Sequence, residues 1–136
     1  MKTVLMFLTL FFLALTGYTQ VETFVHVSEE EEKLVDLLAE KPREFKTNYY
    51  LAAYYYNNAV SLLADQTAGA IPGVEGVDNE IVRLFNAALN PALNAYETDK
   101  NNELVLEMLS GIYFRIGEMD AKEKIDKKLN LSLIHI

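Results

Sequence analysis

The stretch NYYLAAYYYNNAVSLLA at residues 48–64 decides the fold class of this chain. It lies within a run of 18 residues without a charge, between Lys46 and Asp65. At 100° per residue, the tyrosines of a helix here fall on several faces, and a helix that is apolar on several sides must be covered on more than one of them. Its asparagines would be costly in lipid, which argues against a membrane span. We therefore expect a helix from about Glu44 to Ala64, sandwiched between neighbouring helices.

A shorter helix is predicted before this stretch. Ser28 followed by Glu31 is a capping-box pattern, and the apolar residues after it recur at helical spacing to about Glu40. Pro42 ends this helix, because proline disfavours helical geometry in the residue before it. We expect the carboxylates of residues 29–32 to favour the helix dipole and to point into water rather than to hold a cation.

A loop and a long helix are predicted next. Residues 65–78 (DQTAGAIPGVEGVD) contain three glycines and a proline without periodicity, which indicates a loop. Asp78 or Asn79 can cap the following helix. Within that helix Pro91 predicts a kink or a break, because proline removes a backbone hydrogen bond and clashes with the preceding turn.

The last third of the chain predicts two more helices. The first runs from about Asn102 to Ile116, and Gly117 stands where a helix C-cap favours glycine. The second begins near Met119. Its apolar residues are confined to Ala121, Ile125 and Leu129. A helix with one buried and one wet face suits the end of a helical stack.

Residues 1–19 have the layout of a secretory signal peptide. Lys2 precedes an apolar run from Val4 to Leu15, and small polar residues lead to a cleavage site expected after Thr19. A helix of that run is about 18 Å long, short of the roughly 30 Å hydrocarbon core. We expect an exported protein, periplasmic or on the cell surface, with no stable membrane span in the mature chain. An uncleaved membrane anchor stays open as the alternative.

Composition limits the class of partner. The 136 residues suffice for one domain, and 12 basic against 20 acidic residues give a net charge of −8. Such a surface repels phosphate backbones, so we expect no nucleic acid. The chain has no cysteine, so an exported domain of this size must be stabilised by helical packing rather than by disulfides.

Read as pairs, residues 44–98 and 102–130 form two helical hairpins, and the second resembles a tetratricopeptide repeat (TPR) unit in order and spacing. The residues at the family's motif positions are Leu109-Ser110, Tyr113 and Gly117 in the second hairpin and Leu51-Ala52, Tyr55, Ala88, Ala92 and Ala95 in the first. The segments NYYLAAYYYNNAV, LFNAALNPALNAYE and LSGIYFRIGEMDAKEKIDKKL are together similar to the C-terminal part of exported bacterial TPR proteins, over roughly residues 45–130. Lys100, Lys122 and the long loop depart from the family pattern. The resemblance implies an all-α fold, a short right-handed solenoid of antiparallel hairpins.

The resemblance also implies binding of a protein or peptide partner. In this family the first helices of stacked repeats line a concave groove that takes extended peptides or a partner's helix. Carried over by position, the groove candidates are Lys46, Tyr49, Ala53, Tyr56, Asn57, Glu107, Gly111, Phe114 and Arg115. Two alternatives stay open. The chain could be a structural end-piece of a larger repeat protein, which would expose apolar surface at residues 30–40, or a small-molecule binder with a pocket under the loop at 65–78.

No catalytic, metal or cofactor site is predicted. His26 and His135 are the only imidazoles and cysteine is absent, which leaves no framework for nucleophilic catalysis or a metal cluster. The acidic residues lie at caps and on wet faces, without the apolar neighbours that would raise a carboxyl pKa for acid–base work. We expect a non-enzymatic protein.

The end of the chain suggests an incomplete gene record. Residues 131–136 (LSLIHI) are what CTG TCT CTT ATA CAC ATC encodes, which looks like the transposon end used in sequencing libraries. Only a leading segment, residues 20–43, and two hairpins follow the signal peptide, whereas a repeat stack generally needs about three units or more. We expect residues 131–136 to derive from a library adapter and the protein to be a fragment of a longer one.

Overall fold

The computed structural model describes residues 28–69 and 75–134. The predicted signal peptide, residues 20–27 with His26, and His135 lie outside the described residues. The described part forms five helices and no strand, so the all-α prediction is confirmed. The helices are α3 (Glu29–Glu40), α4 (Phe45–Thr67), α5 (Glu75–Thr98), α6 (Glu103–Ile116) and α7 (Met119–Ile134).

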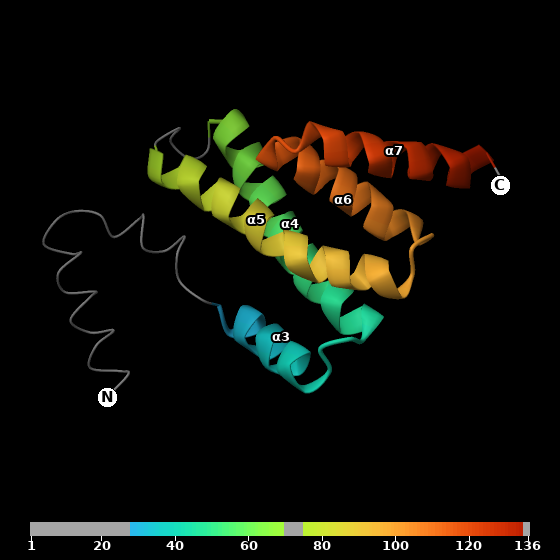
Figure 1. Cartoon of the computed structure of the whole chain (residues 1–136). Coiled ribbons are helices and arrows are strands. Elements are labelled where there is room, and N and C mark those ends of the chain that lie inside the picture. The colour runs from blue at the N-terminus through green and yellow to red at the C-terminus, as the bar shows by residue number, and fades with distance from the viewer. Residues whose placement is uncertain (1–27, 70–74, 135–136) are drawn as a thin grey trace, which may run out of the picture.

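Two antiparallel helix pairs and one flanking helix make up this part of the chain (Figure 1). α4 and α5 run in opposite directions and pack against each other along most of their length. α6 and α7 form the second pair. α5 packs on α6, and α4 also touches α6. The short helix α3 lies against α4 alone among the helices.

Helix α4 is covered on several sides, as its apolar circumference predicts. It packs against α3, α5 and α6. Its buried residues are Thr47, Asn48, Leu51, Ala52, Tyr55 and Ala59. The buried Asn48 amide donates to the carbonyls of Pro42 and Glu44 at 3.0 and 2.9 Å, and its oxygen accepts from Asn94 of α5 at 3.2 Å. Because its polar atoms are paired, this asparagine can be buried at the base of the helix pair.

Small residues let α4 and α5 approach closely. Ala52 and Ala59 of α4 are fully buried, as are Ala88 and Ala95 of α5. Bulkier side chains then fill the space toward α6, and the largest of them are Phe85, Leu106, Leu109 and Ile112. The buried apolar residues form one continuous core from α4 to Ile125 of α7.

Three helix ends predicted from the sequence are confirmed. The Ser28 hydroxyl accepts from the Glu31 N–H at 3.0 Å at the start of α3. The Asn102 side chain accepts from the Val105 N–H at 3.2 Å at the start of α6. Gly117 ends α6 with φ 81°, a left-handed conformation that glycine adopts without steric penalty.

The predicted loop at residues 65–78 is too long. α4 continues to Thr67 and α5 already begins at Glu75, so neither Asp78 nor Asn79 is the cap of α5. The buried face of α5 already includes Val77, which precedes both predicted caps and is 2% exposed. Asp78 instead accepts a hydrogen bond from the Gln66 amide at 2.6 Å, which joins α5 to the end of α4. Residues 70–74 lie outside the described residues.

Pro91 does not break α5, so of the predicted kink or break, the break is wrong. The helix is continuous from Glu75 to Thr98 with the proline inside it. Proline leaves the carbonyl one turn back without its helical partner, at a cost of about 3 kcal/mol. Ala88 and Ala95, on either side, are fully buried, and Pro91 is itself buried. Packing against α4 on both sides of the proline therefore holds the helix together.

The last helix matches its predicted pattern but extends further. Ile125 is buried, Ala121 and Leu129 are half-buried, and the remaining face is largely wet. α7 packs on α6. Its backbone stays helical through Ile134, so the domain boundary predicted after Asn130 does not coincide with a helix end. Leu131 is 59% exposed.

Candidate functional site

A surface depression crosses α4 between α3 and α6. One hollow of about 480 Å³ between α3 and α4 is lined by Glu30, Leu34, Tyr50, Ala53, Tyr54, Asn57 and Asn58. A second hollow of about 250 Å³ between α4 and α6 is lined by Tyr49, Ala53, Tyr56, Asn57, Leu104, Glu107 and Met108. Ala53 and Asn57 line both hollows, so the two meet on α4. We call this surface the α4 groove.

Helical spacing explains how α4 supplies the floor. Residues three or four apart lie on the same side of a helix, so Tyr49 or Tyr50, then Ala53, then Tyr56 or Asn57 follow one another along it. The small side chain of Ala53 leaves the floor low between flanking tyrosines. α3 and α6 then supply the two walls.

A glycine sets the depth of the groove on the α6 side. A Cβ atom at Gly111 would lie 2.5 Å from the Tyr56 hydroxyl oxygen and 3.1 Å from two of its ring carbons. The Tyr56 ring also packs edge-on against the buried Phe85, with ring centroids 5.7 Å apart. The half-buried tyrosine therefore packs between Phe85 of α5 and Gly111 of α6, and a larger residue at position 111 would require its ring to shift.

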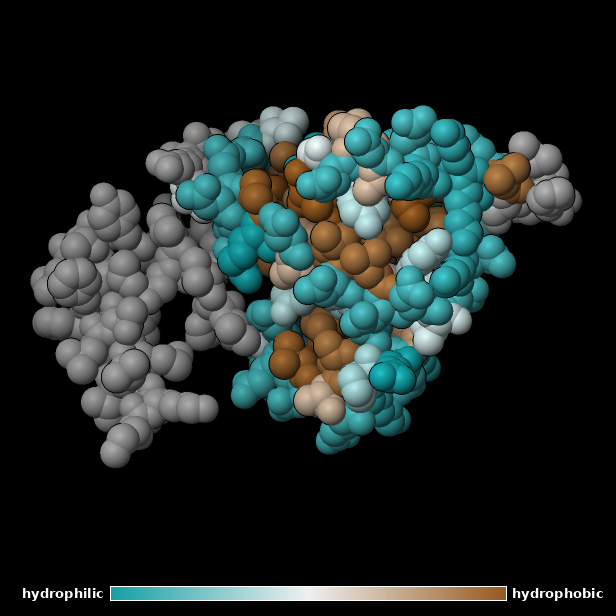
Figure 2. All heavy atoms as spheres, in the orientation of Figure 1, coloured by the Kyte–Doolittle hydropathy of each residue, from teal (hydrophilic) through white to brown (hydrophobic). Residues whose placement is uncertain are grey.

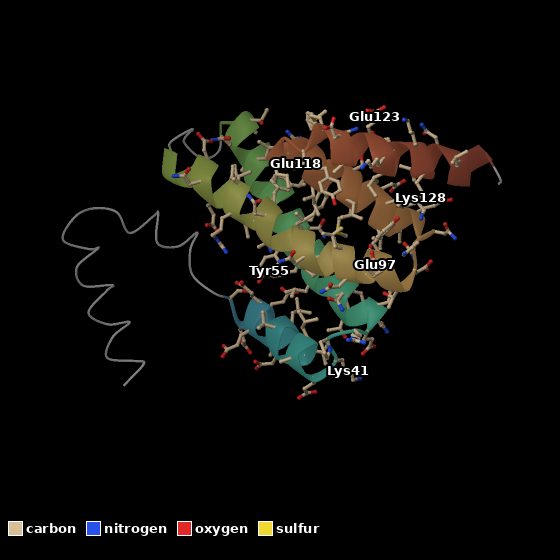
Figure 3. The ribbon with its side chains drawn as sticks, in the orientation of Figure 1. Lys41, Tyr55, Glu97, Glu118, Glu123 and Lys128 are labelled. Carbon is tan, nitrogen blue, oxygen red and sulfur yellow. The ribbon has the colours of Figure 1, made fainter. Side chains whose placement is uncertain are left out.

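Hydrogen bonds made by tyrosine hydroxyls of α4 hold α3, which forms one wall of the groove, against α4. The Tyr55 hydroxyl donates to Glu31 Oε1 at 2.8 Å, and the hydroxyls of Ser28 and Tyr54 share a hydrogen bond. Burial, followed by the hydrogen bond to Glu31, raises the pKa of Tyr55, so this phenol stays a protonated donor. Figure 3 shows Tyr55 at the junction of α3 with the α4–α5 pair. The prediction that all four glutamates of this turn simply point into water is wrong for Glu31.

Charge in the groove is negative. Glu30 lies on the α3 wall and Glu107 on the α6 wall. Among the described residues, neither carboxylate has an ion-pair partner. The Lys46 ammonium lies 5.8 Å from the centroid of the Tyr50 ring, at the edge of the groove, and does not line either hollow.

The structure brings together five of the nine predicted groove residues: Tyr49, Ala53, Tyr56, Asn57 and Glu107. Gly111 lies directly beneath Tyr56. Lys46 lies over Tyr50, outside both linings. Phe114 is 47% exposed, with the Arg115 guanidinium 5.1 Å from its ring centroid, and neither residue joins the groove. The α4 groove therefore extends toward α3 and the first half of α6, and Lys46, Phe114 and Arg115 lie outside its lining.

Several lining residues were not anticipated: Glu30, Leu34, Tyr50, Tyr54, Asn58, Leu104 and Met108. Leu104 could have been found, because it precedes Glu107 by one helical turn and so shares its face. Glu30 and Leu34 could not have been found as lining residues. The apolar spacing of the leading helix indicates which of its faces is covered, but not which helix covers it.

Other kinds of site find no support in the described part of the chain. No group of three or more His, Cys, Asp or Glu side chains within residues 28–69 and 75–134 is arranged to hold a metal ion. Over the same residues, no helix combines the length and the apolar character needed to cross a bilayer. No protein-family model, curated protein or solved structure matches this chain. The tetratricopeptide assignment thus stays a prediction from the sequence.

Proposed function

We propose that this protein is a non-enzymatic, exported scaffold of the tetratricopeptide type, which binds a segment of another protein in the α4 groove. The observation that carries the proposal is the groove itself. Three helices from separate parts of the sequence converge on one depression, and four tyrosines line it together with the amides of Asn57 and Asn58.

The arrangement of the helices supports a scaffold of the tetratricopeptide type. Each antiparallel pair packs on the next through α5 and α6, and the first helices of the two pairs, α4 and α6, also meet. Tyr56 and Gly111 make that contact close. First helices that meet along one side of a stack produce the elongated binding surface of repeat proteins.

The chemistry of the lining suits a peptide. Tyrosines provide large, amphipathic contact area with few rotatable bonds, and the Asn57 and Asn58 amides can both donate to and accept from a peptide backbone. Leu34 and Leu104 add apolar contact on the two walls. Aromatic anchors with polar neighbours are typical of surfaces that recognise extended segments or helices.

A second candidate function is supported by α3. This helix has no buried residue, and Val35 and Leu37 are 44% and 37% exposed. Figure 2 shows apolar side chains gathered near α3, bordered by hydrophilic ones. Exposed apolar surface at residues 30–40 is what the end-piece hypothesis predicts, with another repeat of a longer protein covering α3.

Selection from a random peptide library displayed on phage tests the binding function. The full chain is compared with Ala53→Trp, which fills the place where the two hollows meet. The matched control is Val60→Trp on the same helix, because Val60 is 41% exposed and lines neither hollow. We expect the wild type and the control to enrich the same peptides and Ala53→Trp to lose them. An absence of enrichment, or equal binding by Ala53→Trp with its helicity intact, would contradict the proposal.

A further inference from the structure

We infer that the α4 groove selects a cationic protein segment, whose lysine or arginine side chains meet Glu30 and Glu107. This inference rests on the proposed function, since it names the chemistry of the partner for the same groove.

Two carboxylates on opposite walls carry the argument. Glu30 belongs to α3 and Glu107 to α6, with the floor of α4 between them. Two other glutamates near the groove are neutralised within the chain: Glu29 pairs with Lys33 at 2.8 Å and Glu44 with Lys41 at 3.6 Å. Among the described residues, the two groove carboxylates have no such partner. They are thus available to a basic side chain from outside.

The tyrosines of the groove favour the same charge. A cation over an aromatic ring is attracted by the negative face of its π system. The chain already uses the Tyr50 ring in this way, with the Lys46 ammonium 5.8 Å from its centroid. The rings of Tyr49 and Tyr54 also line the groove. A lysine or arginine can therefore combine an ion pair on a wall with a ring contact on the floor.

Charge complementarity also decides between classes of occupant. The chain carries a net charge of −8, so its field attracts basic segments and repels acidic ones over distances comparable to the Debye length. A second copy of this chain would bring the same negative charge to the groove. A cationic partner gains both the local contacts and the long-range attraction, which raises the association rate.

The composition of the enriched peptides tests the inference directly. We expect an excess of lysine and arginine among them, together with apolar or aromatic residues. Fluorescence anisotropy then gives the affinity of one enriched basic peptide for the wild type and for Glu30→Gln/Glu107→Gln. We expect the double variant to bind about fivefold more weakly at low salt, and the difference to shrink as salt screens the charges.

The matched control is Glu40→Gln/Glu118→Gln. It changes the net charge of the chain by the same amount, at exposed positions that line neither hollow. We expect its affinity for the basic peptide to stay within about twofold of the wild type. Circular dichroism confirms that each variant keeps its helicity.

The outcomes separate this inference from the proposed function. Peptides that bind the wild type and are lost with Ala53→Trp, but that are acidic or neutral, would support a binding groove and overturn the cationic partner. Equal weakening by the two glutamine variants would overturn it as well, because the effect would then belong to net charge and not to the groove. An absence of any enriched peptide would overturn the proposed function and this inference together.

Discussion

The contact between Tyr56 and Gly111 sets the distance between α4 and α6, and with it the depth of one half of the groove. The glycine is within a helix, where alanine would normally be favoured by about 1 kcal/mol. Its presence is explained by the tyrosine ring, which occupies the space a Cβ atom would need. The family resemblance implied only that Gly111 faces a groove, and its contact with Tyr56 was not predicted.

A double-mutant cycle tests this contact. We expect Gly111→Ala to destabilise the wild type by roughly 1 kcal/mol, because overpacking costs about 1–3 kcal/mol and outweighs the gain in helix propensity. In a Tyr56→Ala background the ring is gone, so the same substitution should become neutral or stabilising. Urea denaturation of the four proteins gives the coupling energy. An equal cost in both backgrounds would show that the tyrosine does not set the spacing.

Asp126 links the second helix pair through a pH-dependent contact. Its carboxylate accepts hydrogen bonds from the Lys122 ammonium of α7 and the Ser110 hydroxyl of α6. The bond from Lys122, followed by that from Ser110, lowers the pKa of Asp126 below its usual value. A lowered folded-state pKa stabilises the fold above the unfolded-state pKa, and that stabilisation is lost as the pH falls through the folded-state value.

Asp126→Asn should therefore destabilise the protein at neutral pH and have no electrostatic effect in strong acid. Because the Asp126 side chain is 35% exposed, we expect the difference in unfolding free energy at neutral pH to stay below about 1 kcal/mol. It should disappear as the pH falls below the ordinary aspartate pKa of about 3.9 and through the lower folded value. Urea denaturation of both proteins over this pH range checks the expectation. A difference that does not change with pH would contradict it.

Among the elements, α3 is the least firmly held. It contributes no buried residue, and its contacts with α4 combine half-buried Leu34 and Leu38 with the bond from Tyr55 to Glu31. Helices with few buried apolar contacts open at lower free energy than core helices. One wall of the groove thus belongs to the element that opens most easily.

Hydrogen exchange measured by mass spectrometry checks this ranking. We expect the amides of α3 to exchange faster than those of α5 and α6 in the wild type. Tyr55→Phe removes the hydroxyl that bonds Glu31, so it should speed exchange in α3 further and leave α6 unchanged. Slow exchange in α3, equal to that of α5, would show that the helix is docked as firmly as the core.

The elements also show what the sequence could predict. The bounds of α3 and α6 followed from local signals, since Ser28, Asn102 and Gly117 act through hydrogen bonds and backbone geometry within a few residues. The start of α5 and its continuity through Pro91 depend on burial against α4. Contacts between distant segments override local breakers there, and a single sequence does not show them.

For the molecule as a whole, the groove exists because α3 and α6 lie on opposite sides of α4. The side formed by α6 was predicted through the family resemblance, and five predicted residues line the groove. The side formed by α3 was missed, because its placement depends on contacts such as Tyr55 with Glu31 and Tyr54 with Ser28. Those contacts join residues at least 24 positions apart, beyond the reach of helical periodicity.

The most direct test of the account is an NMR titration of the isotopically labelled chain with a basic peptide from the display selection. The amide signals of Ala53, Asn57 and Glu107 should shift most, because these residues lie on the floor and the α6 wall of the α4 groove. Signals from the wet face of α7 should stay in place. Shifts concentrated on α5 or α7, or none at saturating peptide, would contradict the claim that this groove binds a protein segment.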